Sequence, residues 1–250
     1  MLGDIAAQTI ILAAVAMLVG GTIKGTFGVG LPIGAMGLMT ISIDPHLALG
    51  LMAFPLLVTN LLQAVRAGRV VETIKEYWPI ALTLCLALLI STQLVRDMDT
   101  QALFLVLGLV SVAFAVTSLI RPPPPIPEKW KVWLGPVTGL FAGMIGGLTT
   151  VWGPPIVMYF LATGMQKDDF IRAAGVIWFI GTLPLMAGFI ANGLVNTTTA
   201  PISLLMVPTA VAGFWLGEKI RARIDPARFR KALLWFFLLV GLNLLRRALF

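Results

Sequence analysis

The apolar positions of this chain form long continuous runs, and polar residues gather in the short stretches between them. A run needs roughly 20 residues to cross a bilayer as an α-helix. Such runs recur at 5–23, 47–65, 78–95, 101–120, 132–151, 171–191, 200–217 and 232–245, with shorter ones at 31–43 and 153–163. This pattern predicts an all-α fold: a polytopic transmembrane helical bundle of about ten segments, including broken or re-entrant helices.

Composition supports the same class. Of the 250 residues, 58% are hydrophobic and 12% are charged, whereas soluble domains carry about 25% charged residues. The N-terminal stretch MLGDIAAQ has no basic residue, so we expect a retained first helix and not a cleaved signal peptide. The net charge of +7 is concentrated in short loops, where membrane topology explains it, and we therefore expect no nucleic-acid partner.

Two glycine-rich stretches resemble each other: GGTIKGTFGVGLPI at 20–33 and AGMIGGLTTVWGPPI at 142–156. Each contains glycines, a break, and a Gly-x-Pro or Gly-Pro-Pro step into an apolar run. We therefore predict two transmembrane repeats, an N-terminal one at 1–120 and a C-terminal one at 132–250. The proline-rich segment 121–131 would be a stiff linker between them.

Loop charge predicts that the second repeat is inverted. Loops 66–77 and 217–231 are rich in Lys and Arg, whereas their counterparts in the other repeat, 192–199 and 96–100, have no excess of cations. Because basic loops stay in the cytoplasm, equivalent loops fall on opposite sides. We predict the N-terminus and loop 192–199 outside, with 66–77, 121–131 and 217–231 inside. Inverted repeats are typical of secondary transporters, whose substrate site lies between the repeats near the bilayer midplane.

Each glycine-rich break is predicted to start a new helix within the membrane. Proline suits the first turn of a helix, and a helix start presents free N–H groups and about half a positive charge, which together bind anions. Two such helix starts facing one cavity would form a substrate-binding site for an anion. The candidate residues from the breaks are Lys24, Gly25, Thr26, Gly28, Gly30, Pro32, Gly147, Thr149, Thr150, Trp152, Gly153, Pro154 and Pro155.

Lys24 is the most informative of these residues. A lysine at the bilayer centre costs roughly 2.5–3.5 kcal/mol, so it would need a partner or an anionic substrate; alternatively, it extends to the headgroups. Every Asp and Glu falls at the end of a run or in a loop, which favours an anion over a cation as cargo. Asn60 and Gln63 either line the cavity or hold helices together. Trp178, which lies deep in a later run, joins the candidate set as a cavity wall or a packing residue.

The stretches IKGTFGVGLP and GGLTTVWGPPIVMYFLATGMQKDDFIRA resemble the TauE/SafE (TSUP) family of membrane transporters. This resemblance extends over nearly the whole chain. It implies transport of sulfite, a sulfonate or a related small anion across the bacterial cytoplasmic (inner) membrane by a multi-pass protein. It also implies a secondary transporter that works by alternating access, without catalytic residues, metal or cofactor.

Two alternatives remain at this stage. An anion channel would use the same cavity, and only saturable counterflow separates it from a carrier. An intramembrane lipid-phosphate enzyme could also use helix starts to bind phosphate, but it needs a base or metal cluster, and the apolar runs contain no such group of His, Asp and Glu. The expected partners are the small anionic substrate and membrane lipid, and both a monomer and a homodimer are compatible with the sequence.

Overall fold

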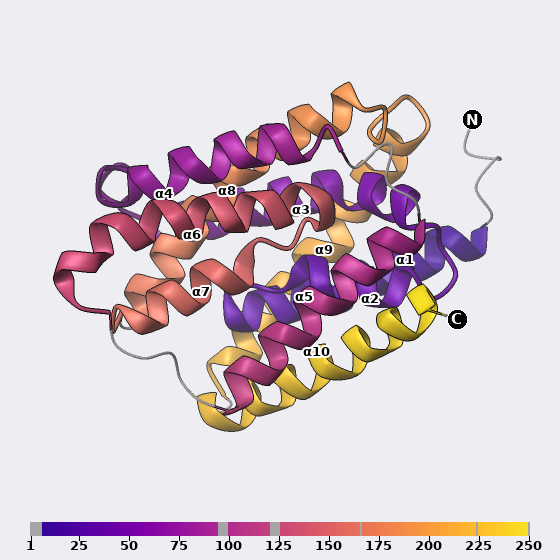
Figure 1. The fold of residues 1–250 in the computed structure, drawn as a ribbon. Helices are drawn as coiled ribbons and strands as arrows, with labels where there is room; N and C mark the ends of the chain where they lie inside the picture. Colours follow the sequence, from indigo (N-terminus) through magenta and orange to yellow (C-terminus); the bar gives the residue numbers. More distant parts are fainter. Residues whose placement is uncertain (1–6, 95–99, 121–125, 166, 224, 250) are drawn as a thin grey trace.

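The computed structural model describes residues 7–94, 100–120, 126–165, 167–223 and 225–249, and every regular element in those ranges is a helix (Figure 1). The predicted all-α fold is therefore confirmed. The side chains of Thr149 and Pro154 and part of the predicted linker 121–131 lie outside the described residues. The helices are α1 Ala7–Phe27, α2 Leu31–Met39, α3 Pro45–Ala67, α4 Val70–Ser91, α5 Thr100–Ile120, α6 Glu128–Thr149, α7 Gly153–Ala162, α8 Lys167–Ala191, α9 Thr199–Arg221 and α10 Pro226–Leu249.

Six of the described helices are long and apolar enough to cross a membrane: α1, α3, α4, α6, α8 and α9. Many of the apolar residues in these helices are not buried inside the protein. In α4, for example, only 33% of the most hydrophobic window is buried inside the protein, so most of this apolar surface faces outward. Such a surface fits lipid and not water. The bundle is that of a polytopic membrane protein, as the apolar runs predict.

The two glycine-rich breaks are turns at which the chain reverses direction. In the first, α1 ends at Phe27 and α2 returns beside it, so that Gly20 packs against Leu31 and Ala35. Gly28 and Gly30 have φ angles of 74° and 105°, a backbone conformation that glycine adopts without steric cost. The α2 helix has nine residues, about half of what a span requires, so α2 by itself is too short to cross a membrane.

The second break has the same form. Thr150, with φ of 60°, follows α6, and α7 starts at Gly153. The end of α7 returns to the start of α6, where the backbone N–H of Ile126 donates to the carbonyl of Ala162 at 2.9 Å. Both breaks are therefore tips of helical hairpins. The prediction that each break starts a new helix is confirmed.

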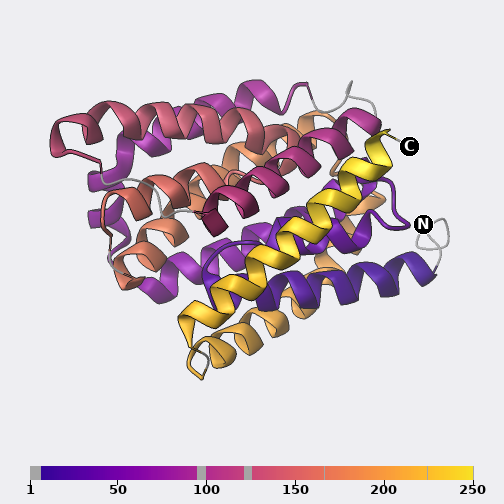
Figure 2. The ribbon, with the colours of Figure 1, turned by 60° about the horizontal axis from the view of Figure 1, so that its bottom comes forward.

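Helices from the two predicted repeats interlock instead of forming separate bodies. The strongest packing joins α1 to α9, α4 to α6 and α5 to α10, while α3 packs against α8 and α9, and α8 packs against α4. Figure 2 shows α5 and α10 side by side across the front of the bundle. The packing pattern repeats when each helix of the first half is exchanged with the helix five positions later, so that α1 corresponds to α6, α3 to α8 and α4 to α9. Under this correspondence the α1–α9 pair matches the α6–α4 pair, and the α3–α9 pair matches the α8–α4 pair.

Side-chain contacts show which loops share an end of the bundle. Arg66, at the end of α3, forms an ion pair of 3.1 Å with Glu218 near the end of α9. At the other end, the Asn192 side chain donates to the carbonyl of Thr92 at 2.9 Å. The start of α1 and the end of α10 also lie at one common end in both views (Figures 1 and 2). The ion pair of Arg66 with Glu218 therefore makes the ends of α3 and α9 neighbours, at the opposite end of the bundle from Asn192.

Candidate functional site

The tips of the two hairpins meet beside the middle of α8. A Cβ atom added to Gly153 would lie 2.7 Å from a methyl group of Val29, so the second tip touches the first. A small cavity of about 30 Å³ lies between them. A water molecule needs roughly 10–15 Å³ on this scale, so the cavity accommodates water but is too tight for a multi-atom anion. The tips are closed on each other.

Half of the residues predicted for the site line this one cavity, although they come from four separate segments of the chain. Those residues are Lys24, Gly30, Pro32, Asn60, Thr150, Trp152, Gly153 and Trp178, and the remaining lining residues are Val29, Ile33, Leu56 and Val151. The first turns of α2 and α7 thus both contribute to the wall. Because each helix start carries about half a positive charge, their electrostatic effects add within the cavity.

Lys24 brings the amine of its side chain, which is positively charged when protonated, to the same wall. Its side chain is 2% exposed, and Nζ donates to Oδ1 of Asn60 at 2.5 Å. Among the described residues, none of the ion pairs includes Lys24; they join cations and acids at other places. A buried ammonium group is costly without a negative partner. A negative charge placed in the cavity would offset this cost.

Two hydrogen bonds from Asn60 of α3 to residues of α8 fix the orientation of the Asn60 side chain. Its Nδ2 group donates to the carbonyl of Trp178 at 3.2 Å and to Oγ1 of Thr182 at 2.6 Å. Since a carbonyl can only accept, the amide nitrogen must face α8, and Oδ1 is left to accept from Lys24. Thr182 in turn donates to the carbonyl of Trp178 at 2.7 Å. The position of the lysine is thus set by helices α1, α3 and α8 together.

Trp178 also fixes the first tip. Its indole Nε1 donates to the carbonyl of Gly28 at 2.9 Å, which anchors the loop between α1 and α2 to the middle of α8. Gln63 lies beside the same loop and donates to the carbonyl of Ile171 at 3.3 Å. Gly28 and Gln63 therefore lie next to the residues of the cavity wall but do not line the cavity.

Several predicted site residues lie elsewhere. Gly25 packs against the backbone of α9 at Phe214, and Gly147 packs against Ser91 of α4, so these glycines permit close helix contact. Thr26 donates to the carbonyl of Thr22 at 2.7 Å within its own helix. Pro155 lines a groove on the outer side of α7, away from the cavity. The side chains of Thr149 and Pro154, also predicted for the site, lie outside the described residues.

Sequence reasoning missed Thr182 and Val29. Thr182 follows Trp178 by four residues and so lies on the same helix face, a spacing that identifies it once Trp178 is chosen. Val29 had no such signal, because its role depends on contact with a tip more than a hundred residues away.

Comparison with known proteins identifies the family. Residues 12–244 match the family described as "Sulfite exporter TauE/SafE". The chain is also 25% identical, over 146 residues, to the "Probable sulfite/organosulfonate exporter TauE" of Cupriavidus necator strain H16. That similarity covers 58% of this chain and 56% of the relative's length. No solved structure matches the chain.

The family match spans nearly the whole chain, including both hairpin tips and the cavity between them. This multi-pass membrane protein therefore belongs to the TauE/SafE sulfite exporter family of membrane transporters.

Proposed function

We propose that this protein is a secondary transporter that moves a small sulfur-containing anion, such as sulfite or a sulfonate, across the bacterial cytoplasmic membrane. One observation carries the proposal. Lys24 is buried without a carboxylate partner among the described residues, in a cavity that also receives the starts of α2 and α7. An anion bound in this cavity would offset the positive charge of the two helix starts and of protonated Lys24 together.

The choice of a sulfur-containing anion is supported by the family and by the name of the relative from Cupriavidus necator. The geometry of the site agrees with a compact oxyanion. Backbone N–H groups at two helix starts, with a lysine beside them, can satisfy several oxygen atoms at once.

Alternating access is supported by the closed cavity and by the repeated packing pattern. A cavity of about 30 Å³ must widen before an anion binds, and separation of the two tips at Val29 and Gly153 would widen it. We infer that segments 1–120 and 132–250 are inverted repeats, because the helix pairs repeat after five helices. Rocking of one repeat against the other would then expose the cavity to each side in turn.

Cysteine labelling tests the inverted arrangement. In a Cys85→Ala background, an impermeant thiol reagent applied to intact cells should label a cysteine at position 197 and not one at 223. Both positions are exposed, on loops that we place on opposite sides of the membrane. Labelling of position 223 from outside would show that the two repeats are not inverted.

Counterflow tests the transport function. Purified protein in liposomes loaded with unlabelled sulfite should accumulate labelled sulfite transiently, and the initial rate should saturate with external sulfite. A channel would equilibrate the label without such an overshoot. Liposomes with protein that show no more sulfite flux than empty liposomes would refute the proposal.

A further inference from the structure

The packing of the bundle divides eight of its helices into two groups of four. Helix α9 packs along α1 and also contacts α3, while α2 lies against α1. Helix α4 packs along α6 and also contacts α8, while α7 lies against α6. We call α1, α2, α3 and α9 the first body, and α4, α6, α7 and α8 the second body. The main contact between the two bodies joins α3 to α8, beside the central cavity.

Backbone contact joins the two repeats within each body. In the first body, a Cβ atom at Gly25 of α1 would collide with the carbonyl of Phe214 in α9. In the second body, a Cβ atom at Gly143 of α6 would lie 2.6 Å from the carbonyl oxygen of Leu84 in α4. Because glycine lets these helices touch along their backbones, even a small separation would forfeit contacts along the whole pair. Each pair is therefore expected to stay together when the protein changes conformation.

A proline in α3 strengthens the bond between α3 and α9. Proline has no N–H group, so Pro55 leaves the carbonyl of Leu51 without its usual donor one turn later in the helix. Ser203 of α9 donates its hydroxyl to this carbonyl at 2.8 Å and accepts from the N–H of Phe54 at 3.1 Å. A helix of the second repeat thus completes the hydrogen bonding of a helix of the first.

The corresponding pair in the second body has the same feature. Pro184 of α8 leaves the carbonyl of Ile180 without its usual helical donor. The thiol of Cys85 in α4 donates to this carbonyl, with an S···O distance of 3.9 Å. Here a helix of the first repeat serves a helix of the second, as the correspondence of α3 with α8 and α9 with α4 requires.

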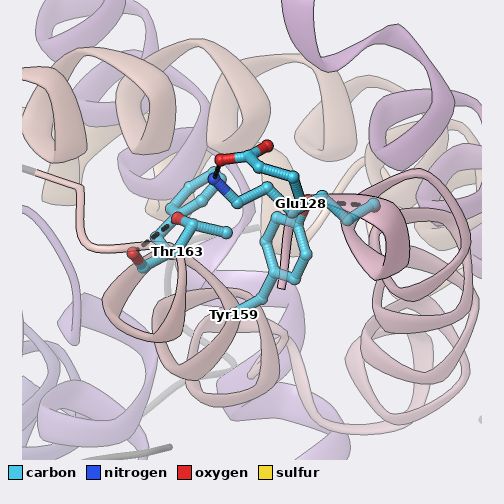
Figure 3. A network of polar contacts seen from close by, with 5 residues as sticks. Glu128, Tyr159 and Thr163 are labelled. Atoms are coloured by element: carbon cyan, nitrogen blue, oxygen red, sulfur yellow. Dashed lines mark hydrogen bonds and ion pairs between the residues drawn. The ribbon is translucent and has the colours of Figure 1, made fainter. Parts of the chain in front are cut away.

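Polar contacts also hold α7 to α6 at the open end of the second hairpin. Figure 3 shows Glu128, Tyr159 and Thr163 within one polar network. In that network the hydroxyl of Tyr159 donates to the carbonyl of Lys131 at 3.2 Å, and Lys131 forms an ion pair with Glu128. The second hairpin is therefore one piece of the second body and not a separate flap.

The chain passes directly between the two bodies at two places. Residues 68–69 link α3 to α4, and residues 192–198 link α8 to α9. Gly68 and Gly193 have φ angles of 70° and 71°, and a Cβ atom at either glycine would meet nothing within 4 Å. Glycine changes its backbone angles at little steric cost, and here no neighbouring atom has to move. These two glycines are suited to be hinges.

We propose that transport proceeds by motion of the first body against the second, with hinges at Gly68 and Gly193. This inference rests on the proposed transport function and specifies which parts of the protein move. The rocking of one repeat against the other then has a defined form, in which α4 and α9 each move with the opposite repeat. The glycine contacts stay closed, whereas the hydrogen bonds from Asn60 and Gln63 to α8 are exchanged as the cavity widens.

Distances between spin labels test which parts move. In a Cys85→Ser background, Leu61→Cys/Leu82→Cys places labels on different bodies of one repeat, and Val15→Cys/Leu205→Cys places them on different repeats within the first body. All four labelled positions are exposed. Pulsed electron paramagnetic resonance in liposomes should show that sulfite shifts the first distance and leaves the second constant. The labels are attached as thioethers because sulfite cleaves disulfides.

The opposite result is expected if each repeat moves as an intact unit: the second distance would shift and the first would stay constant. A shift of the second distance, or a constant first distance, overturns the proposal.

Cross-linking connects this motion to transport. Arg66→Cys/Glu218→Cys, bridged by a bismaleimide, joins α3 to α9 within the first body, where the native side chains form an ion pair. This bridge should leave most of the sulfite flux intact. Gln63→Cys/Ile171→Cys is the matched control, because dibromobimane would join α3 of the first body to α8 of the second and should abolish flux. Loss of flux with the first bridge, or full flux with the second, contradicts the proposal.

Flux through the unbridged and unlabelled protein separates failure of this inference from failure of the transport function. If sulfite shifts only the distance between the bodies but liposomes with protein show no more flux than empty liposomes, the moving bodies are supported and the transport function is refuted. If flux is present while the distance between the bodies stays constant, the transport function stands and the moving bodies are refuted.

Discussion

The two hairpin tips have the same backbone design but different chemistry. Both reverse the chain through residues in the left-handed region, and both place a proline near the start of a short helix. Aligning Gly30–Pro32 with Gly153–Pro155 puts Gly147 at the position that corresponds to Lys24. The first tip thus contributes a charge, and the second contributes only backbone and the aromatic wall of Trp152.

Packing explains why the charge occurs only once. Lys24 points toward α3, where Asn60 accepts its hydrogen bond, whereas Gly147 lies directly against Ser91 of α4. A lysine at position 147 would collide with that helix. We infer that the repeated backbone builds the cavity, and that the single lysine makes it selective for anions.

The largest effect is expected from enlarging the residue at which the tips touch. Gly153→Leu should abolish transport while membrane insertion remains intact, because the new side chain would enter the space that Val29 occupies. Transport of sulfite into liposomes measures the loss, and helical content by circular dichroism checks the fold. Ala191→Leu, a similar enlargement at an exposed position, should transport normally. Normal transport by Gly153→Leu would show that the tips do not form the site.

The next largest effect is expected from removing the lone charge. Lys24→Met keeps much of the side-chain volume and should weaken sulfite binding by about tenfold or more, which corresponds to about 1.4 kcal/mol. Lys24→Arg should restore binding only in part, because its planar head is larger and favours other hydrogen-bond geometry. Calorimetry on purified protein measures both. If Lys24→Met binds sulfite like the wild type, the two tips bind the anion through their backbone alone. The lysine that distinguishes the first tip from the second would then contribute nothing to sulfite binding.

Neutralising Lys24 without removing it gives a finer test. Asn60→Asp should place a carboxylate beside the ammonium group, 2.5 Å from Nζ if the geometry is kept, and so compete with the substrate. We expect sulfite binding to weaken roughly fivefold, a smaller effect than removal of the lysine, because the cation is still present. Asn192→Asp, in the loop that we place outside the membrane, should leave the dissociation constant unchanged. Tighter binding in Asn60→Asp would contradict the role given to Lys24.

The smallest effect is expected where α8 anchors the first tip. Trp178→Phe removes the hydrogen bond to the carbonyl of Gly28 and should destabilise the protein by about 1 kcal/mol. Thermal unfolding in detergent should show a lower midpoint for this variant than for Trp215→Phe, which changes an exposed residue of α9. Equal midpoints would mean that the first tip is held by packing and not by this bond.

The sequence by itself determined the membrane-spanning class, the two breaks and the helix starts that follow them. These features depend on local properties: the length of an apolar run, the freedom of glycine and the lack of an N–H group in proline. The lysine at the first break could also be identified as unusual from sequence, because a cation in an apolar run is costly wherever the chain folds.

Only the tertiary structure decided which residues of the breaks face the cavity. Gly25 and Gly30 look equivalent in sequence, yet the first packs against α9 and the second lines the cavity. Asn60 and Gln63 belong to one polar row, but three helical positions separate them, so they meet different parts of α8 and only Asn60 reaches Lys24. Such distinctions arise from contacts between different helices that are far apart in the chain, and periodicity within one segment carries no information about them.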